Sequence, residues 1–316
     1  MADTISEDNA QSSSVSLFQR PLFVAIFALT AAILWGWAYP LIKLGFGEFG
    51  ITRDMTGGKI LFAGTRFFLS GVIILIFARA IGKPFALRRK SDCWFMLLFA
   101  LLNTTIHYIC FYIGLSNAEG ARSAIINSLS VFSVVILACV FFKSDKMSWR
   151  KVVGCAMGFG GILSLNLGNG SDGGHFTMLG DGMIILNALS SATASLLTRE
   201  MSHRVNIIVG TGYSLAVGGF LLIAIGLLLG GTLPVITPLG VLYWMLLVMI
   251  SSLAFILYNR LIIYNPVGKV AIYNSLMPVI GVLTSCMCLG ETFHYKYAIA
   301  TILVALGIYI INKGKR

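Results

Sequence analysis

Residues 22–42, LFVAIFALTAAILWGWAYPLI, form a run of 21 residues without a charged side chain. An α-helix needs about 20 apolar residues to cross the hydrocarbon core of a bilayer. Comparable segments recur to the end of the chain, whereas a cleaved signal peptide has a shorter apolar core and no such successors. Only 11% of the residues are charged, compared with about 25% in soluble domains. The sequence therefore predicts an all-α polytopic membrane protein.

The connections between the apolar segments carry most of the charge, and their composition predicts the orientation of the chain. Of the 23 Lys and Arg residues, 17 fall on the side that holds both termini and 6 on the other side. Loops rich in Lys and Arg stay in the cytosol, so we expect cytosolic termini and a protein of the plasma (inner) membrane. The net charge of +11 is spread over these loops, which indicates orientation and not nucleic-acid binding. The ten predicted spans cover roughly 22–44, 58–81, 93–115, 120–142, 150–167, 178–199, 206–230, 239–263, 267–290 and 293–312.

Two short segments, AIINSLSV at 124–131 and AIYNSLMP at 271–278, are near-copies 147 residues apart. At the same separation Arg122 corresponds to Lys269 and Cys139 to Cys286. Ten spans with an internal copy predict two halves of five helices each. Because five is odd, the second half enters the membrane from the opposite side. Such inverted repeats are the architecture of many secondary transporters, whose substrate site lies near the midplane between the halves.

Three longer segments resemble a known family. LWGWAYPLIK (34–43) and AGTRFFLSG (63–71) are similar to the first and second helices of EamA domains, which belong to the drug/metabolite transporter superfamily. LYNRLIIYNPVGKVAIYNSLMPVIGVLTSCMCLGETF (257–293) resembles their C-terminal repeat through its Pro-Val and Leu-Gly-Glu elements. In the first half Val131 stands where Pro278 stands, and FKSDK (142–146) replaces Leu-Gly-Glu.

The resemblance implies ten helices, cytosolic termini and the movement of small metabolites, with no particular substrate. The chain then divides into a disordered tail (1–20), a first EamA-like repeat (21–167), an outer linker (168–177), a second repeat (178–312) and a basic tail (313–316). We expect a small-molecule substrate such as an amino acid or a related organic anion or zwitterion, lipid around the protein, no cofactor, and a monomer or homodimer.

Polar and aromatic residues at membrane depth tend to face a cavity or another helix, so they are the candidates for substrate binding. His107 either binds a substrate carboxylate or carries a proton, unless it is a neutral imidazole bonded to a neighbouring helix. The serines have an equal alternative in close helix packing. The predicted substrate site consists of Trp35, Trp37, Asn103, His107, Asn187, Ser191, Ser252 and Tyr258.

Residues that correspond between the halves and lie near the two membrane surfaces are the candidates for gating. Asn127 is expected below the outer mouth and Asn274 above the inner one, with a basic pair nearer each mouth that attracts a carboxylate or phosphate. Side chains that snorkel to the interface are the alternative for the cations, and a static kink is the alternative for the proline. The predicted gating residues are Lys43, Arg122, Asn127, Arg199, Lys269, Asn274 and Pro278.

Several other functions find little support in the sequence. The acidic residues, Asp181 and Glu291 among them, fall at span ends or in loops, so proton coupling through an embedded carboxylate is not expected. No protease-type motif is present, and the six cysteines are scattered through apolar segments, which predicts neither an enzyme nor a metal site. A sensor or assembly partner without transport stays open, as does a nucleoside, nucleotide-sugar or drug transporter. Gly154 and Gly158 pack either against another protomer or, preferably, within the bundle.

Overall fold

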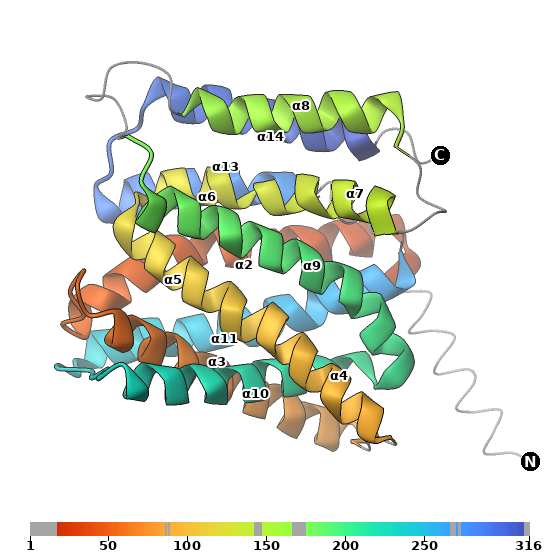
Figure 1. Cartoon of the computed structure of the whole chain (residues 1–316), viewed down its shortest axis with the longest axis vertical. Helices are drawn as coiled ribbons and strands as arrows, with labels where there is room; N and C mark the ends of the chain where they lie inside the picture. Colours follow the sequence, from red (N-terminus) through yellow and green to blue (C-terminus); the bar gives the residue numbers. More distant parts are fainter. Residues whose placement is uncertain are drawn as a thin grey trace, which may run out of the picture.

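The computed structural model describes residues 18–85, 87, 89–141, 147–165, 175–265, 270 and 273–312, and all regular structure in these ranges is helical. The described helices form ten rods, each a single helix or a helix with one interruption, that cross the molecule as the sequence predicts (Figure 1). The rods of the first half are α2 (Pro21–Glu48), α3 (Thr56–Ala80), α4–η1–α5 (Lys90–Ala100, Leu101–Ile106, His107–Asn117), α6–α7 (Gly120–Asn127, Leu129–Phe141) and α8 (Trp149–Ser164). Those of the second half are η2–α9 (Met178–Gly182, Met183–Arg204), α10 (Ile207–Leu228), α11 (Pro238–Tyr264), η3–α13 (Tyr273–Ser275, Leu276–Leu289) and α14 (Tyr295–Asn312).

The outward faces of these rods are as apolar as the interior. Leu228 is 87% exposed and Met287 is 80% exposed, which would be unfavourable over so wide an area in water. Six of the rods are long and apolar enough to cross a membrane by length and composition, and α13 and α14 are shorter apolar helices. The molecule is therefore an integral membrane protein whose exposed apolar side chains face lipid.

The two halves have inverted orientations. α2 begins and α14 ends at the same end of the bundle, here called the terminal end, whereas α9 begins at the opposite, far end (Figure 1). Contacts between helices also occur in equivalent pairs, since α2 packs on α11 and α13 as α9 packs on α5 and α7. α3 contacts its own equivalent α10, and α8 contacts its equivalent α14. These paired contacts confirm two inverted five-helix repeats.

Glycines bring the equivalent helices of the two halves into close contact. On α3 and α10, glycines recur every seventh residue, and a Cβ atom on Gly71 would lie 2.2 Å from the Ala216 nitrogen. On α8 and α14, a Cβ on Gly154 or Gly307 would lie 2.5 Å from the carbonyl oxygen of the other glycine. Small residues let membrane helices approach at backbone distance. The Gly154 stripe thus packs within the bundle, as preferred from the sequence.

Both copies of the Asn-Ser segment interrupt their helices. In the first half the helix breaks at Ser128, between α6 and α7, and in the second half η3 precedes α13 at Asn274 and Ser275. A proline ring clashes with the carbonyl four residues earlier, so Pro278 accounts for the second break. The first break occurs without a proline, at the equivalent position. The two halves therefore share an irregular backbone at the Asn-Ser segment, but only the second half has a proline that accounts for it.

Candidate functional site

Asn127 ties three helices from both halves together in the half of the bundle nearer the far end. Its side-chain amide donates to the hydroxyl of Tyr39 on α2 at 2.9 Å. Its side-chain oxygen accepts from the amide of Asn187 on α9 at 2.6 Å. Asn127 sits at the C-terminal end of α6, where the helix breaks, so its side chain reaches both neighbours. The predicted gating residue Asn127 and the predicted binding residue Asn187 are thus in direct contact.

Asn274 makes a related contact nearer the terminal end. Its amide donates to the hydroxyl of Tyr258 on α11 at 2.8 Å, and its side-chain oxygen is buried with no partner in the described residues. The Tyr258 ring also lies edge-on against Trp35 of α2, with centroids 5.0 Å apart. Each half therefore has an Asn–Tyr contact at its helix break. The two contacts differ in that Asn127 has two side-chain partners and Asn274 has one.

A cluster of aromatic rings lies beside the Asn127 contact. Tyr39 meets Phe111 edge-on at 5.5 Å, and Tyr108 lies 3.8 Å from Phe67 and 4.3 Å from His107, measured between ring centroids. Nδ1 of His107 is buried without a hydrogen-bond partner, and no carboxylate of the described residues pairs with the ring. The ring also has a hydrogen bond with the backbone of Asn187 on α9, as in the alternative of an imidazole bonded to a neighbouring helix. A role of His107 in substrate contact therefore stays a prediction.

The aromatic cluster also encloses a cation that the sequence analysis did not select. Arg66 of α3 is 3% exposed, and its guanidinium carbon lies 4.1 Å from the ring centroid of Phe67 and 5.5 Å from that of Tyr112. A charge within a membrane helix usually marks a functional path or a paired group. A charged residue inside the apolar segment 58–81 is the signal in the sequence that points to it.

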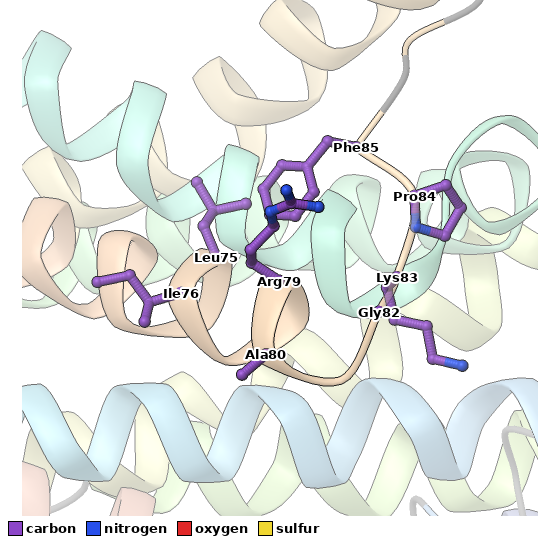
Figure 2. A pocket seen from close by; sticks show the side chains of 8 residues that line it. All are labelled: Leu75, Ile76, Arg79, Ala80, Gly82, Lys83, Pro84 and Phe85. Carbon is purple, nitrogen blue, oxygen red and sulfur yellow. The ribbon is translucent and has the colours of Figure 1, made fainter.

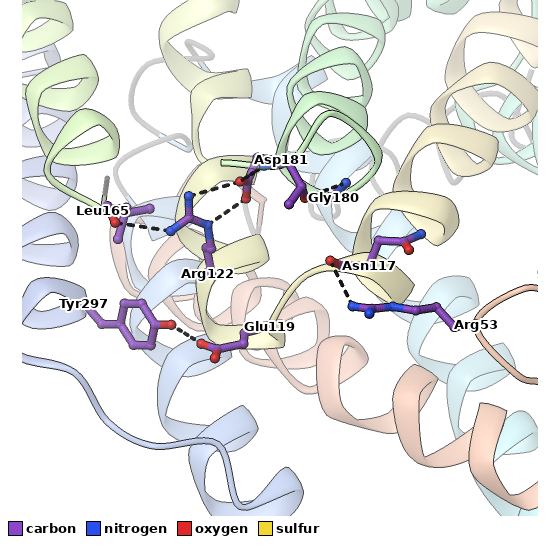
Figure 3. A network of polar contacts seen from close by, with 9 residues as sticks. Arg53, Asn117, Glu119, Arg122, Leu165, Gly180, Asp181 and Tyr297 are labelled. Atoms are coloured by element: carbon purple, nitrogen blue, oxygen red, sulfur yellow. Dashed lines mark hydrogen bonds and ion pairs between the residues drawn. The ribbon is translucent and has the colours of Figure 1, made fainter. Parts of the chain in front are cut away.

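A buried ion pair lies at the far end (Figure 3). Arg122 donates to the two carboxylate oxygens of Asp181 at 2.7 and 3.0 Å and to the carbonyl of Leu165 at 3.2 Å. The side chains of both partners are under 5% exposed. Such a fork of two parallel bonds is the strong form of the Arg–carboxylate interaction. Asp181, placed at a span end by the sequence, thus neutralises a predicted gating cation.

A second ion pair at the far end joins the halves. Lys43 of α2 contacts Glu291 at 2.9 Å, and the Glu291 carboxylate also accepts from the backbone nitrogens of Gly120 and Ala121 at 2.8 and 3.0 Å. A carboxylate at a helix N-terminus satisfies free N–H groups and complements the helix dipole. Tyr297 donates to Glu119 next to this cap. In this structure the two outer cations of the predicted gate contact carboxylates of the chain itself.

The other predicted site residues are distributed over helix contacts and the surface. Asn103 donates to Ser214 on α10 at 3.0 Å, and Ser252 donates to a carbonyl of its own helix at 2.9 Å. Ser191 is half-buried, and its carbonyl accepts from Ser195. Trp37 is 40% exposed, on the face of α2 opposite Trp35. The structure therefore brings together Asn127 with Asn187, and Trp35 with Tyr258 and Asn274, but not the whole set. Lys269 and the side chain of Arg199 lie outside the described part of the structure.

The terminal end has looser polar contacts in its described residues. Arg204 contacts Asp92 at 3.3 Å and Glu200 at 2.8 Å, and its side chain is 31% exposed. An open cavity of about 750 Å³ lies where α3 ends, beside Arg79 and Lys83 (Figure 2). None of the predicted site residues lines this cavity. No group of three His, Cys, Asp or Glu side chains gathers in the described ranges.

Comparison with known proteins places this geometry in a family. The model of the EamA-like transporter family matches residues 22–167 and 178–313. The chain is 26% identical to the transporter YvbV of Bacillus subtilis over 91% of each protein. It is 25% identical to the inner membrane transporter YedA of Escherichia coli K12, over 93% of the chain and 92% of YedA. A crystal structure with 19% identity superposes with a TM-score of 0.66 over 91% of the chain and 95% of the other protein, which supports the same fold.

Proposed function

Because the chain belongs to the EamA-like transporter family, we propose that it moves amino acids or related organic anions and zwitterions across a membrane. The proposed mechanism is alternating access between the two inverted repeats. Inverted repeats supply two shapes of similar energy, one open to each side, around a site near the midplane. Transport of a small molecule and the membrane location follow from the family, whereas the substrate class and the mechanism are our proposal.

The observation that carries the mechanism is the pair of Asn–Tyr contacts at the two helix breaks. Asn127 meets Tyr39 in the half of the bundle nearer the far end, and Asn274 meets Tyr258 in the half nearer the terminal end. In each case a hydrogen bond joins two rods at a point where the backbone is already irregular. Breaking one contact and keeping the other would open one side of the central region at a time. We therefore assign the two contacts the role of gates.

The substrate class is supported by the polar chemistry of the interior. Amides and a hydroxyl meet where Asn127 contacts Asn187 and Tyr39. An amide and a hydroxyl meet separately at the other Asn–Tyr contact. Arg66 adds a buried positive charge among aromatic rings. All Asp and Glu residues of the described ranges lie within two turns of a helix end or in a connection. The described region around Arg66 contains a cation and no carboxylate, which favours anions and zwitterions over cations.

The proposed location is the plasma (inner) membrane with both termini in the cytosol. The excess of Lys and Arg on the side of the termini supports this orientation, and the relative YedA carries the name of an inner membrane transporter. The assembly unit that we propose is a monomer or homodimer, because the glycine stripes on α3, α8, α10 and α14 are already used inside one chain.

Counterflow in proteoliposomes tests the proposed function. Vesicles that contain the purified full chain are preloaded with one unlabelled amino acid or organic acid, and uptake of the same labelled compound is followed. A transporter accumulates label transiently, whereas a sensor or an assembly partner gives the uptake of empty vesicles. Repeating the assay with a pH gradient, for the wild type and for His107→Gln, tests whether His107 carries a proton. Uptake that is independent of the gradient removes that role.

A further inference from the structure

Arg66 has no counter-ion among the described residues, in a part of the protein where a buried charge costs much free energy. It is the eleventh residue of α3, which places it ~15 Å along the helix axis from Thr56, well inside the bundle. The described acidic residues all lie near helix ends or in connections, and none of the ion pairs that they form includes Arg66. Lys43 and Arg122, the two cations nearer the surface, each have a carboxylate partner.

The hydrogen bonding of Arg66 is also incomplete. Nη1 donates to the carbonyl of Leu247 at 3.4 Å, a long distance for a charged donor. Nε is buried and has no partner in the described residues. A guanidinium offers five N–H donors in a planar fork, so most of this capacity is not used by the protein.

The aromatic rings around Arg66 compensate its charge only in part. The guanidinium lies over Phe67 and near Tyr108 and Tyr112, where the ring faces attract a cation. Tyr112 is 0% exposed, and its hydroxyl has no hydrogen-bond partner in the described residues. A second unused donor therefore lies in the same cluster as the first. Two buried donors without acceptors indicate an acceptor that enters from outside.

We propose that Arg66 binds the carboxylate of the transported molecule, with the Tyr112 hydroxyl as a second donor and the rings of Tyr108 and Phe111 against its apolar part. This inference rests on the proposed function and adds the residue that recognises the charge. A planar carboxylate matches the guanidinium fork, and the aromatic cluster favours an amino acid or organic acid with an apolar side chain. Because Arg66 is enclosed in this conformation, binding requires the surrounding rings to part, which couples recognition to the movement of α3 against α5.

The test measures binding to the purified full-length protein by thermal stabilisation. The probes are the twenty standard amino acids and a set of mono- and dicarboxylates, each beside its carboxamide, together with phenyl phosphate. We expect carboxylates to stabilise the wild type and their amides not to. Arg66→Gln weakens the carboxylate affinity by about tenfold or more, and Arg66→Lys weakens it less because the charge stays while the fork is lost.

Two further variants separate recognition from folding. Arg260→Gln is the matched control, because Arg260 also lies over a ring, 4.5 Å from the centroid of Phe18, and its affinities stay those of the wild type. Tyr112→Phe keeps the ring and removes only the hydroxyl, so it keeps the fold and weakens carboxylate binding by about threefold. If Arg66→Gln does not fold, the Tyr112→Phe and Arg66→Lys affinities decide.

Three results overturn the inference: no carboxylate stabilises the wild type, phenyl phosphate binds in place of carboxylates, or the Arg66 and Tyr112 variants bind carboxylates like the wild type. Counterflow of the same compounds distinguishes this failure from that of the proposed function. If counterflow occurs only with uncharged solutes or amines, the proposed transport function is retained and the carboxylate site at Arg66 is rejected. If no compound shows counterflow but carboxylate binding still depends on Arg66, the proposed transport function is rejected and the carboxylate site is retained.

Discussion

The far and terminal ends of the bundle are related by the inverted repeat but are held together by different interactions. At the far end, the pair Arg122–Asp181 joins two helices, and the pair Lys43–Glu291 joins α2 to the connection between α13 and α14. The first pair is almost fully buried. At the terminal end, the pairs in the described residues involve Arg204, whose side chain is 31% exposed. The asparagine contacts are also more numerous at the far end, where Asn127 has two side-chain partners, than at the terminal end, where Asn274 has one.

This difference shows that one fold repeated in two orientations need not have two equal ends. Exposed ion pairs contribute about 0–1 kcal/mol, whereas breaking a buried pair by removing one partner costs about 3–5 kcal/mol. Because solvent screens the exposed pairs of the terminal end more than the buried pair of the far end, we expect the far end to be the harder one to open in the proposed cycle. A substrate that compensates this cost would couple its own binding to the opening of the far end.

The largest expected effect comes from breaking the buried pair. Asp181→Asn leaves the Arg122 charge buried without its counter-ion, and we expect a loss of about 3–5 kcal/mol of unfolding free energy. The comparison at the terminal end is Asp92→Asn. The side chain of Asp92 is 10% exposed and also accepts from the backbone nitrogen of Arg89 at 3.2 Å. We expect a smaller loss of about 1–2 kcal/mol, because asparagine keeps this cap and the partner Arg204 is partly exposed. Thermal and denaturant unfolding in detergent measure both. Equal losses for the two variants would show that the ends are held equally.

A smaller effect is expected when Glu291 loses its charge. Glu291→Gln weakens the contact with Lys43 and the cap on α6, which together amount to about 1–2 kcal/mol. Cys286 of α13 lies near this carboxylate and reports on opening of the far end, while Cys93 is exposed near the start of α4. In a variant with only these two cysteines, we expect maleimide to label Cys286 several-fold faster after Lys43→Gln, which breaks the pair but keeps the Glu291 charge beside the thiol, and Cys93 at an unchanged rate. An unchanged rate at Cys286 would mean that the Lys43–Glu291 pair does not hold the far end closed.

The smallest effect is expected at the terminal end. Glu200→Gln removes an exposed pair with Arg204 one helical turn away, which is worth about 0.3–0.5 kcal/mol. Salt screens such a pair, so the difference from the wild type disappears at high ionic strength. The Asp181→Asn difference persists under the same conditions because its partner is buried. Unfolding measured at low and high salt sharpens the comparison, and a salt-independent loss for Glu200→Gln would contradict it.

Helix number and the inverted repeat could be predicted from the sequence because their signals are local. The break at Ser128 could not, because Val131 stands where the second half has Pro278. Apolar length defines each span, and the copies at 124–131 and 271–278 define the repeat. The far-end pairs could not be predicted, since Lys43 and Glu291 are 248 residues apart and meet only through packing. Arg66 was visible as a charge in the segment 58–81, but its burial depends on how α5 and α11 cover it. Residues two apart on a helix point about 200° away from each other, so the opposite faces of Trp35 and Trp37 were predictable.

The central claim is that the two Asn–Tyr contacts are gates of one transport cycle, and counterflow of Asn127→Ala and Asn274→Ala at matched expression tests it most directly. We predict that each variant slows counterflow by about fivefold or more, because each lost bond is worth about 1 kcal/mol. Asn127→Ala has the larger effect because it loses two bonds. Tyr39→Phe and Tyr258→Phe follow their partners with smaller losses. Counterflow at the wild-type rate in both asparagine variants would contradict the claim.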